Sequence, residues 1–244
     1  MPNEIFHNFG AAVSALAQQL AGAKRLLVGI TGPTASGKSM FARQLHKRLN
    51  KKGTPTHIFE GDRFVIPHAR RVKDASFPDG IYEVERMRET VKSLFLRQPF
   101  QAPFYVKDGW ATGRISVAMG AKVLPSVVVE ECRPKMIAPH NELMIDPQTG
   151  DVLEQILPGD EIWIFDSELS LFYEDLRSLY NKTVGLRASR DVRRRNFLGA
   201  VSRGERYPLL TPTEAIAKIE GFWRRDDEMI AKTVELADLL VVLE

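Results

Sequence analysis

The amino-acid sequence predicts an α/β protein in which helices cover both faces of a mainly parallel sheet, a three-layer α/β/α fold. Short apolar segments alternate along the chain with longer segments whose apolar residues recur at helical spacing. This alternation is typical of parallel sheets, because consecutive parallel strands need a crossover connection that is usually a helix. The 244 residues are compatible with one such domain over 1–244, and their 44% hydrophobic content is enough for a buried core.

The N-terminal half is predicted to supply two strands and three helices. Val13, Leu16 and Leu20 share one face of the first helix, which would form an N-terminal extension over 1–23. Residues 98–125 are rich in proline, glycine and aromatic residues, which predicts loops with short strands. In chain order we expect a helix over 3–22, a strand over 25–31, a helix to about residue 50, a strand over 55–60 and a helix over 80–97.

The C-terminal half is predicted to supply the remaining strands. A β-branched run predicts a buried strand over 124–131, and residues 141–166 predict an inserted hairpin whose turn contains proline and glycine. Thr211 and Glu214 form a capping box at a helix start. In chain order we then expect a helix over 168–180, a strand over 182–187, helices over 189–203 and 212–235, and a last strand over 238–243.

A glycine-rich segment between the first strand and the following helix is the strongest indication of chemistry. It has the pattern G-x-x-x-x-G-K-S. Its glycines let the backbone wrap around a phosphate, and the helix dipole favours negative charge. The lysine would reach the β- and γ-phosphates, and the serine would ligate Mg²⁺. The sequence therefore predicts a P-loop NTPase fold that binds ATP and Mg²⁺ at Gly32, Pro33, Thr34, Ala35, Ser36, Gly37, Lys38, Ser39 and Met40.

Positive charge is concentrated in one short segment. The whole chain has 34 Lys and Arg against 31 Asp and Glu, whereas residues 187–206 hold seven arginines and only two carboxylates. Such a cluster favours phosphate, in a nucleotide or in nucleic acid, and the alternative is a solvated helix face. Because the cluster is compact and the rest of the chain is slightly acidic, we expect no nucleic-acid partner.

The sequence argues against membrane-spanning and secreted proteins. Its apolar runs are far shorter than the roughly 20 residues that a membrane span needs. The N-terminus has no cationic segment leading into a continuous apolar one. The single cysteine, Cys132, permits no disulfide within the chain, as is usual in a reducing compartment. We therefore expect a cytoplasmic protein without membrane contact.

Several further segments follow the P-loop in the order found in a known group of enzymes. They are Glu60-Gly61-Asp62-Arg63-Phe64, Ala102-Pro103-Phe104-Tyr105 with Arg114, Val128-Val129-Glu130, Asp191-Val192-Arg193-Arg194-Arg195 and Arg203-Gly204-Glu205-Arg206. Together with the P-loop, they make the chain resemble the uridine kinase and phosphoribulokinase family of P-loop kinases from about Leu26 to Val242. The resemblance implies an ATP- and Mg²⁺-dependent phosphotransferase that moves the γ-phosphate to a hydroxyl group of a small molecule. It also implies an acceptor-pocket segment over 98–125, a helical lid over 187–206, and a homodimer or homotetramer.

The resemblance implies roles for the carboxylates and for the P-loop lysine. Asp62 would accept the proton of the acceptor hydroxyl, and Lys38 would stabilise the transferred phosphoryl group. Glu130 would orient Mg²⁺ together with Ser39, with Glu131 as the alternative. These carboxylates are predicted to follow the carboxyl ends of strands, where parallel α/β sheets bind their ligands.

The arginine cluster and the acceptor segment receive roles in the same way. On a helical wheel Arg190 and Arg194 share a face and would meet the phosphates, with Arg195 or Arg203 as alternatives. Arginines supplied by a closing lid would also exclude water from the reaction. The acceptor would bind at Asp62, Arg63, Tyr105, Trp110 and Arg114.

Departures from the family pattern leave the acceptor open. The segment after Tyr105 lacks the histidine expected of pyrimidine-nucleoside kinases. Arg70, Arg71, Lys73 and Lys107 would suit an anionic acceptor such as a sugar phosphate, so a nucleoside, a sugar and a sugar phosphate all remain candidates. The competing hypothesis is a regulatory P-loop protein that binds nucleotide without acceptor turnover, and a polynucleotide kinase is the third.

Overall fold

The computed structural model describes residues 2–73, 76–106, 113–116, 142–207 and 210–244. The described chain forms two compact units, Met1–Gly61 with Gly159–Glu244, and Asp62–Pro158. We call them unit 1 and unit 2. The predicted strand over 124–131, with Glu130 and Glu131, lies outside the described residues, as does Trp110.

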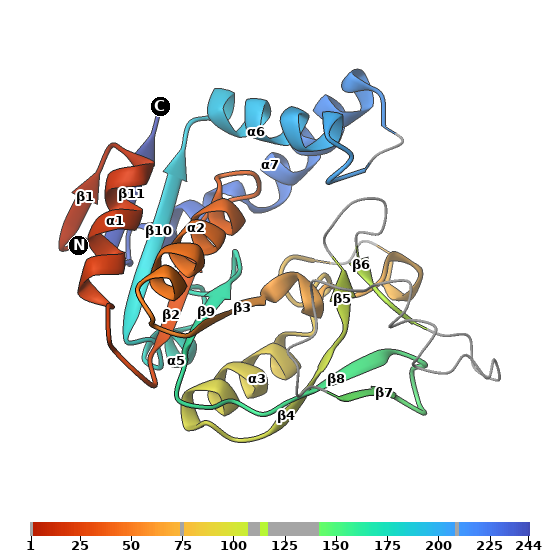
Figure 1. Ribbon diagram of the computed structural model, residues 1–244. Coiled ribbons are helices and arrows are strands. Elements are labelled where there is room, and N and C mark those ends of the chain that lie inside the picture. Colours follow the sequence, from red (N-terminus) through yellow and green to blue (C-terminus); the bar gives the residue numbers. More distant parts are fainter. Residues whose placement is uncertain (1, 74–75, 107–112, 117–141, 208–209) are drawn as a thin grey trace. The chain divides into compact units, whose positions relative to one another are not determined.

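Unit 1 is built on a six-stranded sheet in the order β1-β11-β10-β2-β9-β3, and every neighbouring pair is parallel (Figure 1). The strands are β1 (Glu4–Phe6), β2 (Leu27–Thr31), β3 (Thr56–Glu60), β9 (Ile162–Asp166), β10 (Lys182–Ala188) and β11 (Leu239–Leu243). The central strands read as nearly continuous apolar runs because both faces of a parallel sheet are buried. The predicted α/β fold with a parallel sheet is confirmed.

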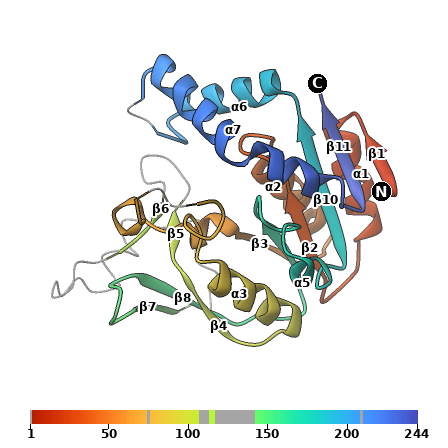
Figure 2. The same cartoon turned by 180° about the vertical axis from the view of Figure 1, so that it is seen from behind.

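Helices cover both faces of this sheet. Figures 1 and 2 show α1 and α2 on one face and α7 on the other, with α6 packed against α7. The helices of unit 1 are α1 (Phe9–Gln19), α2 (Lys38–Lys51), α5 (Glu174–Arg177), α6 (Arg190–Ser202) and α7 (Pro212–Val234). The main apolar core lies between the sheet and the α1–α2 pair, where Phe41, Leu45 and Ile30 are fully buried. No helix among the described residues is long and apolar enough to cross a membrane.

The N-terminal extension is a strand followed by a helix, so the prediction of one helix over 3–22 is wrong at its start. Residues Glu4–Phe6 pair in parallel with β11 at the edge of the sheet. The side chain of Asn8 accepts a hydrogen bond from the backbone N–H of Ala11 at 2.8 Å and thereby caps α1. Because Asn8 has extended backbone angles, the helix begins after this cap.

The hairpin predicted over 141–166 is shorter than expected. Strands β7 (Glu142–Ile145) and β8 (Val152–Ile156) form the antiparallel hairpin, whereas residues 162–166 form the parallel strand β9 between β2 and β3. After β9, the helix predicted over 168–180 is reduced to the single turn of α5.

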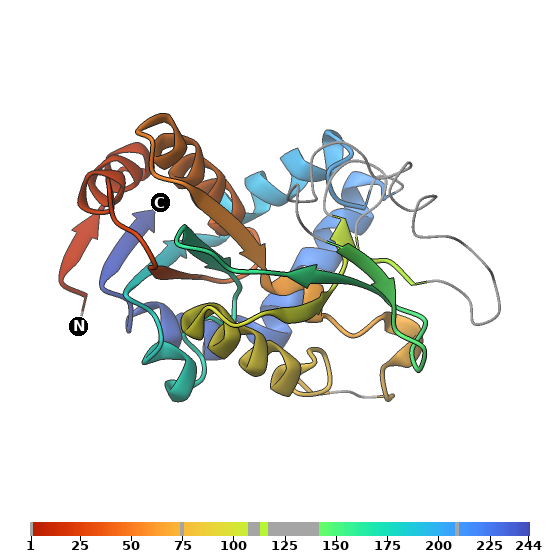
Figure 3. The same ribbon diagram turned by 60° about the horizontal axis from the view of Figure 1, so that its bottom comes forward.

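Among its described residues, unit 2 contains a small antiparallel sheet in the order β4-β8-β7 and the helix α3 (Val84–Leu96), which contacts β4 (Figure 3). Its remaining elements are the strands β4 (Phe100–Pro103), β5 (Tyr105–Val106) and β6 (Gly113–Arg114) and the 3₁₀ turns Gly61–Phe64 and His68–Arg70, the first of which begins at the last residue of unit 1. Phe64, Met87 and Phe104 are fully buried. Several charged side chains are buried beside these apolar residues, as described below.

Candidate active site

The P-loop connects β2 to α2, as predicted, and its two glycines have backbone angles that a larger residue rarely adopts. Gly32 has φ of 152°, and a Cβ atom there would lie 2.7 Å from both the Leu186 carbonyl oxygen and Ser36 Oγ. Gly37 has φ of 102° and precedes the first residue of α2. Glycine is therefore required at both positions to keep this loop shape.

The loop presents polar groups suited to an anion. Ser36 Oγ is buried and has no hydrogen-bond partner within the described residues. The Lys38 ammonium donates to the Gly32 carbonyl oxygen at 2.7 Å and to the Pro33 carbonyl oxygen at 3.2 Å. A buried hydroxyl without a partner and an ammonium group beside a helix N-terminus fit a bound phosphate chain.

A carboxylate ends the strand next to the P-loop strand, and sequence analysis missed it. Asp166 is the last residue of β9 and lies in register with Ile30 of β2 and Glu60 of β3. Two residues later Glu168 is buried, and its carboxylate accepts a hydrogen bond from Thr34 Oγ1 at 3.2 Å. The run Ile162–Asp166 has the same form as the run ending at Glu130, so the same signal was present in a second segment.

Oxygen donors near the P-loop are of the chemical type that Mg²⁺ prefers. Within the described residues no group of three His, Cys, Asp or Glu side chains forms a closed metal site. Mg²⁺ in phosphoryl-transfer enzymes needs only one or two protein oxygens, because substrate phosphates and water complete its octahedron. The hydroxyl of Ser39 and the carboxylate of Asp166 are of the required type.

The arginine-rich helix α6 contributes Arg193, which was not among the arginines predicted to meet the phosphates. Arg193 Nε donates to the Thr34 carbonyl oxygen of the P-loop at 2.8 Å, and its guanidinium forms a two-point ion pair with Asp227 of α7 at 2.7 and 2.8 Å. Arg190 lies over the ring of Trp223, 5.5 Å from its centre. Arg194 lies on the exposed side of α6, 3.9 Å from a carboxylate oxygen of Glu220.

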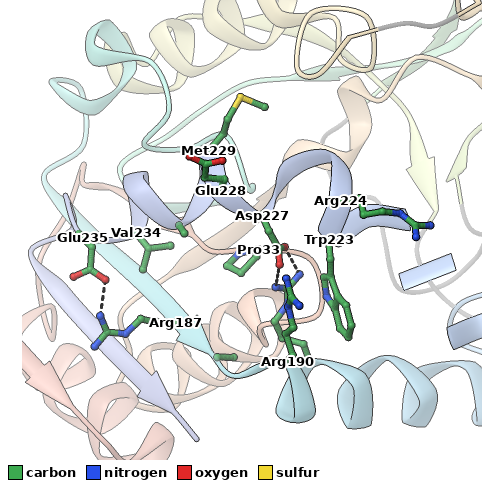
Figure 4. A pocket seen from close by; sticks show the side chains of 13 residues that line it. Pro33, Arg187, Arg190, Trp223, Arg224, Asp227, Glu228, Met229, Val234 and Glu235 are labelled. Atoms are coloured by element: carbon green, nitrogen blue, oxygen red, sulfur yellow. Dashed lines mark hydrogen bonds and ion pairs between the residues drawn. The ribbon is translucent and has the colours of Figure 1, made fainter. Parts of the chain in front are cut away.

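Two cavities of unit 1 adjoin the P-loop. One, of about 720 Å³, lies beside Pro33 between the end of β10, the start of α6 and the second half of α7 (Figure 4). Figure 4 shows Arg190 and Trp223 side by side in it and the ion pair of Arg187 with Glu235 at its other end. The other, of about 300 Å³, is lined by His7, Phe9, Met40, Val192, Arg195, Asn196, Leu243 and Glu244.

Trp110 lies outside the described residues. The other acceptor residues predicted from the resemblance lie in unit 2, and their surroundings differ from one another. The Tyr105 hydroxyl lies 3.4 Å from a carboxylate oxygen of Asp62, so these two side chains are neighbours as expected. Arg63 forms a buried ion pair with Glu154 at 2.6 Å and also donates to the Pro103 carbonyl oxygen. Arg63 therefore has partners within its own unit.

Arg114 is likewise buried among carboxylates. It pairs with Glu83 at 2.7 Å and with Asp151 at 2.5 Å, and Arg70 forms a two-point ion pair with the same Asp151. Burial alone would raise the pKa of Asp151, but the hydrogen bonds from Arg70 and Thr149 and the charges of Arg114 and Arg70 outweigh burial, so its pKa is lowered. Asp151 is thus held as a carboxylate anion.

Comparison with known proteins identifies this fold. No protein-family model and no curated protein sequence matches the chain. Among solved structures, a candidate fructose transport system kinase from a Silicibacter species matches with a TM-score of 0.55 at 16% identity, over 96% of this chain and 98% of that one. A candidate uridine kinase from Bacillus stearothermophilus matches with 0.52 at 16% identity, over 96% and 98%, respectively. D-glycerate 3-kinase from Cryptococcus neoformans matches with 0.51 at 12% identity, over 96% and 92%. The chain therefore has the fold of P-loop kinases of the uridine kinase and phosphoribulokinase type.

Proposed function

We propose that this protein is a kinase that transfers the γ-phosphate of ATP to a hydroxyl group of a small molecule. The observation that carries the proposal is the P-loop, with its two required glycines, the buried hydroxyl of Ser36 and the ammonium of Lys38. The likeness to several P-loop kinases over nearly the whole chain supports the same reaction class. In such a reaction the protein mainly aligns the reactants and neutralises charge.

The proposed roles follow from the chemistry of each side chain. Lys38 neutralises the β- and γ-phosphates, and its present carbonyl partners would be exchanged for phosphate oxygens. Asp62 accepts the proton of the acceptor hydroxyl, and Tyr105 beside it orients the carboxylate. Arg190 and Arg194 stay candidates for phosphate contacts, because each is exposed on α6.

We further propose that Ser39 and Asp166 hold Mg²⁺. Asp166 ends β9, which lies between β2 and β3, and open α/β sheets bind their ligands at the carboxyl ends of strands. When bound, the ion would neutralise charge on the phosphate oxygens. Glu130 remains an alternative, because it lies outside the described residues.

The nucleotide base is proposed to occupy the cavity of about 300 Å³ that begins at Met40. Met40 directly follows Ser39, so this cavity continues from the phosphate-binding end of the loop. His7 and Phe9 line it, which gives the N-terminal extension a part in nucleotide binding. An aromatic ring and an imidazole can stack on a purine.

The acceptor is proposed to be a neutral polyhydroxyl compound, such as a nucleoside or a sugar. Among the described cations of unit 2, Arg63, Arg70 and Arg114 already pair with carboxylates, and Arg71 donates to the Ile66 carbonyl oxygen. These pairs shape the unit instead of offering charge to an anion. Of the predicted acceptor residues in the described part of unit 2, Asp62 and Tyr105 are those that we propose contact the acceptor hydroxyl.

The test is ADP release from Mg-ATP in the presence of uridine, cytidine, other nucleosides, pantothenate, glycerate, hexoses and sugar phosphates. We expect turnover with one neutral acceptor, and a loss of about 10²-fold or more in Lys38→Ala and Asp62→Asn. Lys24→Ala and Asp79→Asn change exposed residues of the same types and should leave turnover unchanged. Binding of ATP without turnover on any acceptor would favour the regulatory alternative instead.

A further inference from the structure

Two side chains of α6 donate hydrogen bonds to backbone carbonyl oxygens of the P-loop. Arg193 Nε donates to the Thr34 carbonyl oxygen at 2.8 Å, and Asn196 Nδ2 donates to the Ala35 carbonyl oxygen at 3.0 Å. The two residues are three apart in the helix and therefore lie on one face of it. They bind two consecutive peptide groups of the loop.

Arg193 is itself fixed, and its charge is already neutralised. Its side chain is only 4% exposed, and Asp227 of α7 binds both of its terminal nitrogens. Its guanidinium carbon also lies 5.4 Å from the centre of the Trp223 ring. An arginine held by a two-point ion pair and an aromatic ring keeps one orientation. Arg193 is thus suited to hold the P-loop backbone in place and not to move with a bound phosphate group.

Holding these carbonyl oxygens also orients the amide groups of the loop. In a trans peptide the C=O and N–H groups point in opposite directions, so the N–H groups of Ala35 and Ser36 are turned away from α6. The Ser36 N–H indeed donates back across the loop to the Pro33 carbonyl oxygen. Ala35 has φ of 64°, a left-handed conformation that a residue with a side chain adopts rarely and only when its surroundings impose it.

We propose that Arg193 and Asn196, with Asp227 behind Arg193, are positioning residues that hold the P-loop in its anion-binding conformation before nucleotide arrives. This inference rests on the proposed function, because it assumes that the loop binds nucleotide. It also changes the expected lid. The first two turns of α6 are attached to the P-loop and α7, so closure over the phosphates would have to begin after Asn196.

The experiment is calorimetric titration of the full chain with ADP, alongside thermal melting of each variant. Arg193→Lys keeps a cation for Asp227 but cannot keep both its carboxylate contacts and the bond to Thr34. Asn196→Ala removes the donor to Ala35. We expect each variant to bind ADP about five- to tenfold more weakly, as for the loss of one hydrogen bond. Asn196→Gln, which keeps an amide donor, should recover part of the affinity.

The matched control is Arg187→Lys, the same substitution in an exposed ion pair. This pair joins Arg187 of β10 to Glu235, the residue that follows α7. It should bind ADP like the wild type. If Arg193→Lys and Asn196→Ala lower the melting temperature but bind ADP with wild-type affinity, the residues are merely structural and the inference is wrong. If the wild type itself fails to bind ADP, the proposed function falls and the inference falls with it.

Discussion

The two units of this protein are stabilised in different ways. Unit 1 buries long apolar strands between helices, and its P-loop is shaped by backbone conformation and by hydrogen bonds to backbone atoms. Unit 2 has a smaller apolar core and contains two ion pairs buried on both sides, Arg63 with Glu154 and Arg114 with Asp151, and a third in which the partly exposed Arg70 pairs with the buried Asp151. In unit 1 the sheet is stabilised mainly by apolar burial, and the nearly buried pair of Arg193 with Asp227 joins two helices, whereas a small sheet depends more on such pairs.

Under the proposed function, this difference separates two tasks. Binding a phosphate chain requires a loop of fixed shape, which the sheet and α6 of unit 1 provide. Choosing an acceptor requires polar side chains at defined positions, and buried ion pairs hold such positions only while both partners are present. Unit 2 should therefore respond more strongly than unit 1 to the removal of a single charge.

The largest effect is expected from Arg114→Met. The substitution removes the cation that lies between Glu83 and Asp151, whose side chain is 0% exposed, while Arg70 still pairs with Asp151. Breaking one side of a buried ion pair costs about 3–5 kcal/mol of unfolding free energy, and the retained pair with Arg70 places the expected loss at the lower end of this range. Urea unfolding followed by circular dichroism would measure this loss. Arg88→Met, which removes a pair with the well-exposed Glu85, should cost less than about 1 kcal/mol.

Both variants lie in unit 2, so comparable losses would contradict the claim that its buried ion pairs contribute more to stability than its exposed pairs do. Hydrogen exchange can also locate the effect. In Arg114→Met the amides of β7 and β8 should exchange faster, while those of β2 and β9 keep their protection.

The next effect tests the backbone-built site of unit 1. In Gly32→Ala the new Cβ would meet the Leu186 carbonyl oxygen and Ser36 Oγ at 2.7 Å. The strain should destabilise the chain by about 1–3 kcal/mol and displace the loop from its phosphate-binding shape. ADP titration should therefore show at least a tenfold loss of affinity, by our order-of-magnitude estimate. An unchanged affinity would mean that the loop tolerates a side chain at Gly32.

A smaller effect is expected from pH. The pKa of Asp151 is lowered in the folded protein, so its contribution to stability is complete above the unfolded pKa, about 3.9, and is lost as the pH falls through the lower folded value. Urea unfolding between pH 6 and pH 3 should show this loss. Asp151→Asn should be less stable at pH 6 and show a weaker dependence on pH, whereas an equal dependence in both proteins would exclude Asp151 as its source.

The features predicted from sequence are those that local patterns determine. The P-loop, α2 and strands such as β2 follow from residues adjacent in the chain, because apolar spacing and glycine conformation act locally. Strand β9 was assigned to the hairpin over 141–166 because it follows the turn that contains proline and glycine, whereas its pairing with β2 and β3 places it in the parallel sheet. That pairing joins distant segments, as does the three-residue contact of β1 with β11.

The ion pairs of unit 2 were not predicted from the sequence, because they too join residues that are distant in the chain. Arg63 and Glu154 are 91 residues apart, and Arg114 and Asp151 are 37 apart. Charged residues are common along the chain, so spacing does not reveal which of them are buried together. Arg63 and Arg114 were predicted to contact the acceptor, and their buried carboxylate partners explain why a structural role is now favoured.

The smallest effect should stabilise unit 1 and is expected from Gly221→Ala. Gly221 lies within α7, and a Cβ atom there would have no neighbour within 4 Å. Alanine reduces the freedom of the unfolded chain and favours the helix, so the variant should gain about 0.5–1 kcal/mol in urea unfolding. Gly32→Ala, with the same change in composition, should lose stability. If Gly221→Ala lost stability as well, α7 would be less regular at Gly221 than its backbone indicates. Helix propensity would then contribute less to the stability of unit 1 than packing does.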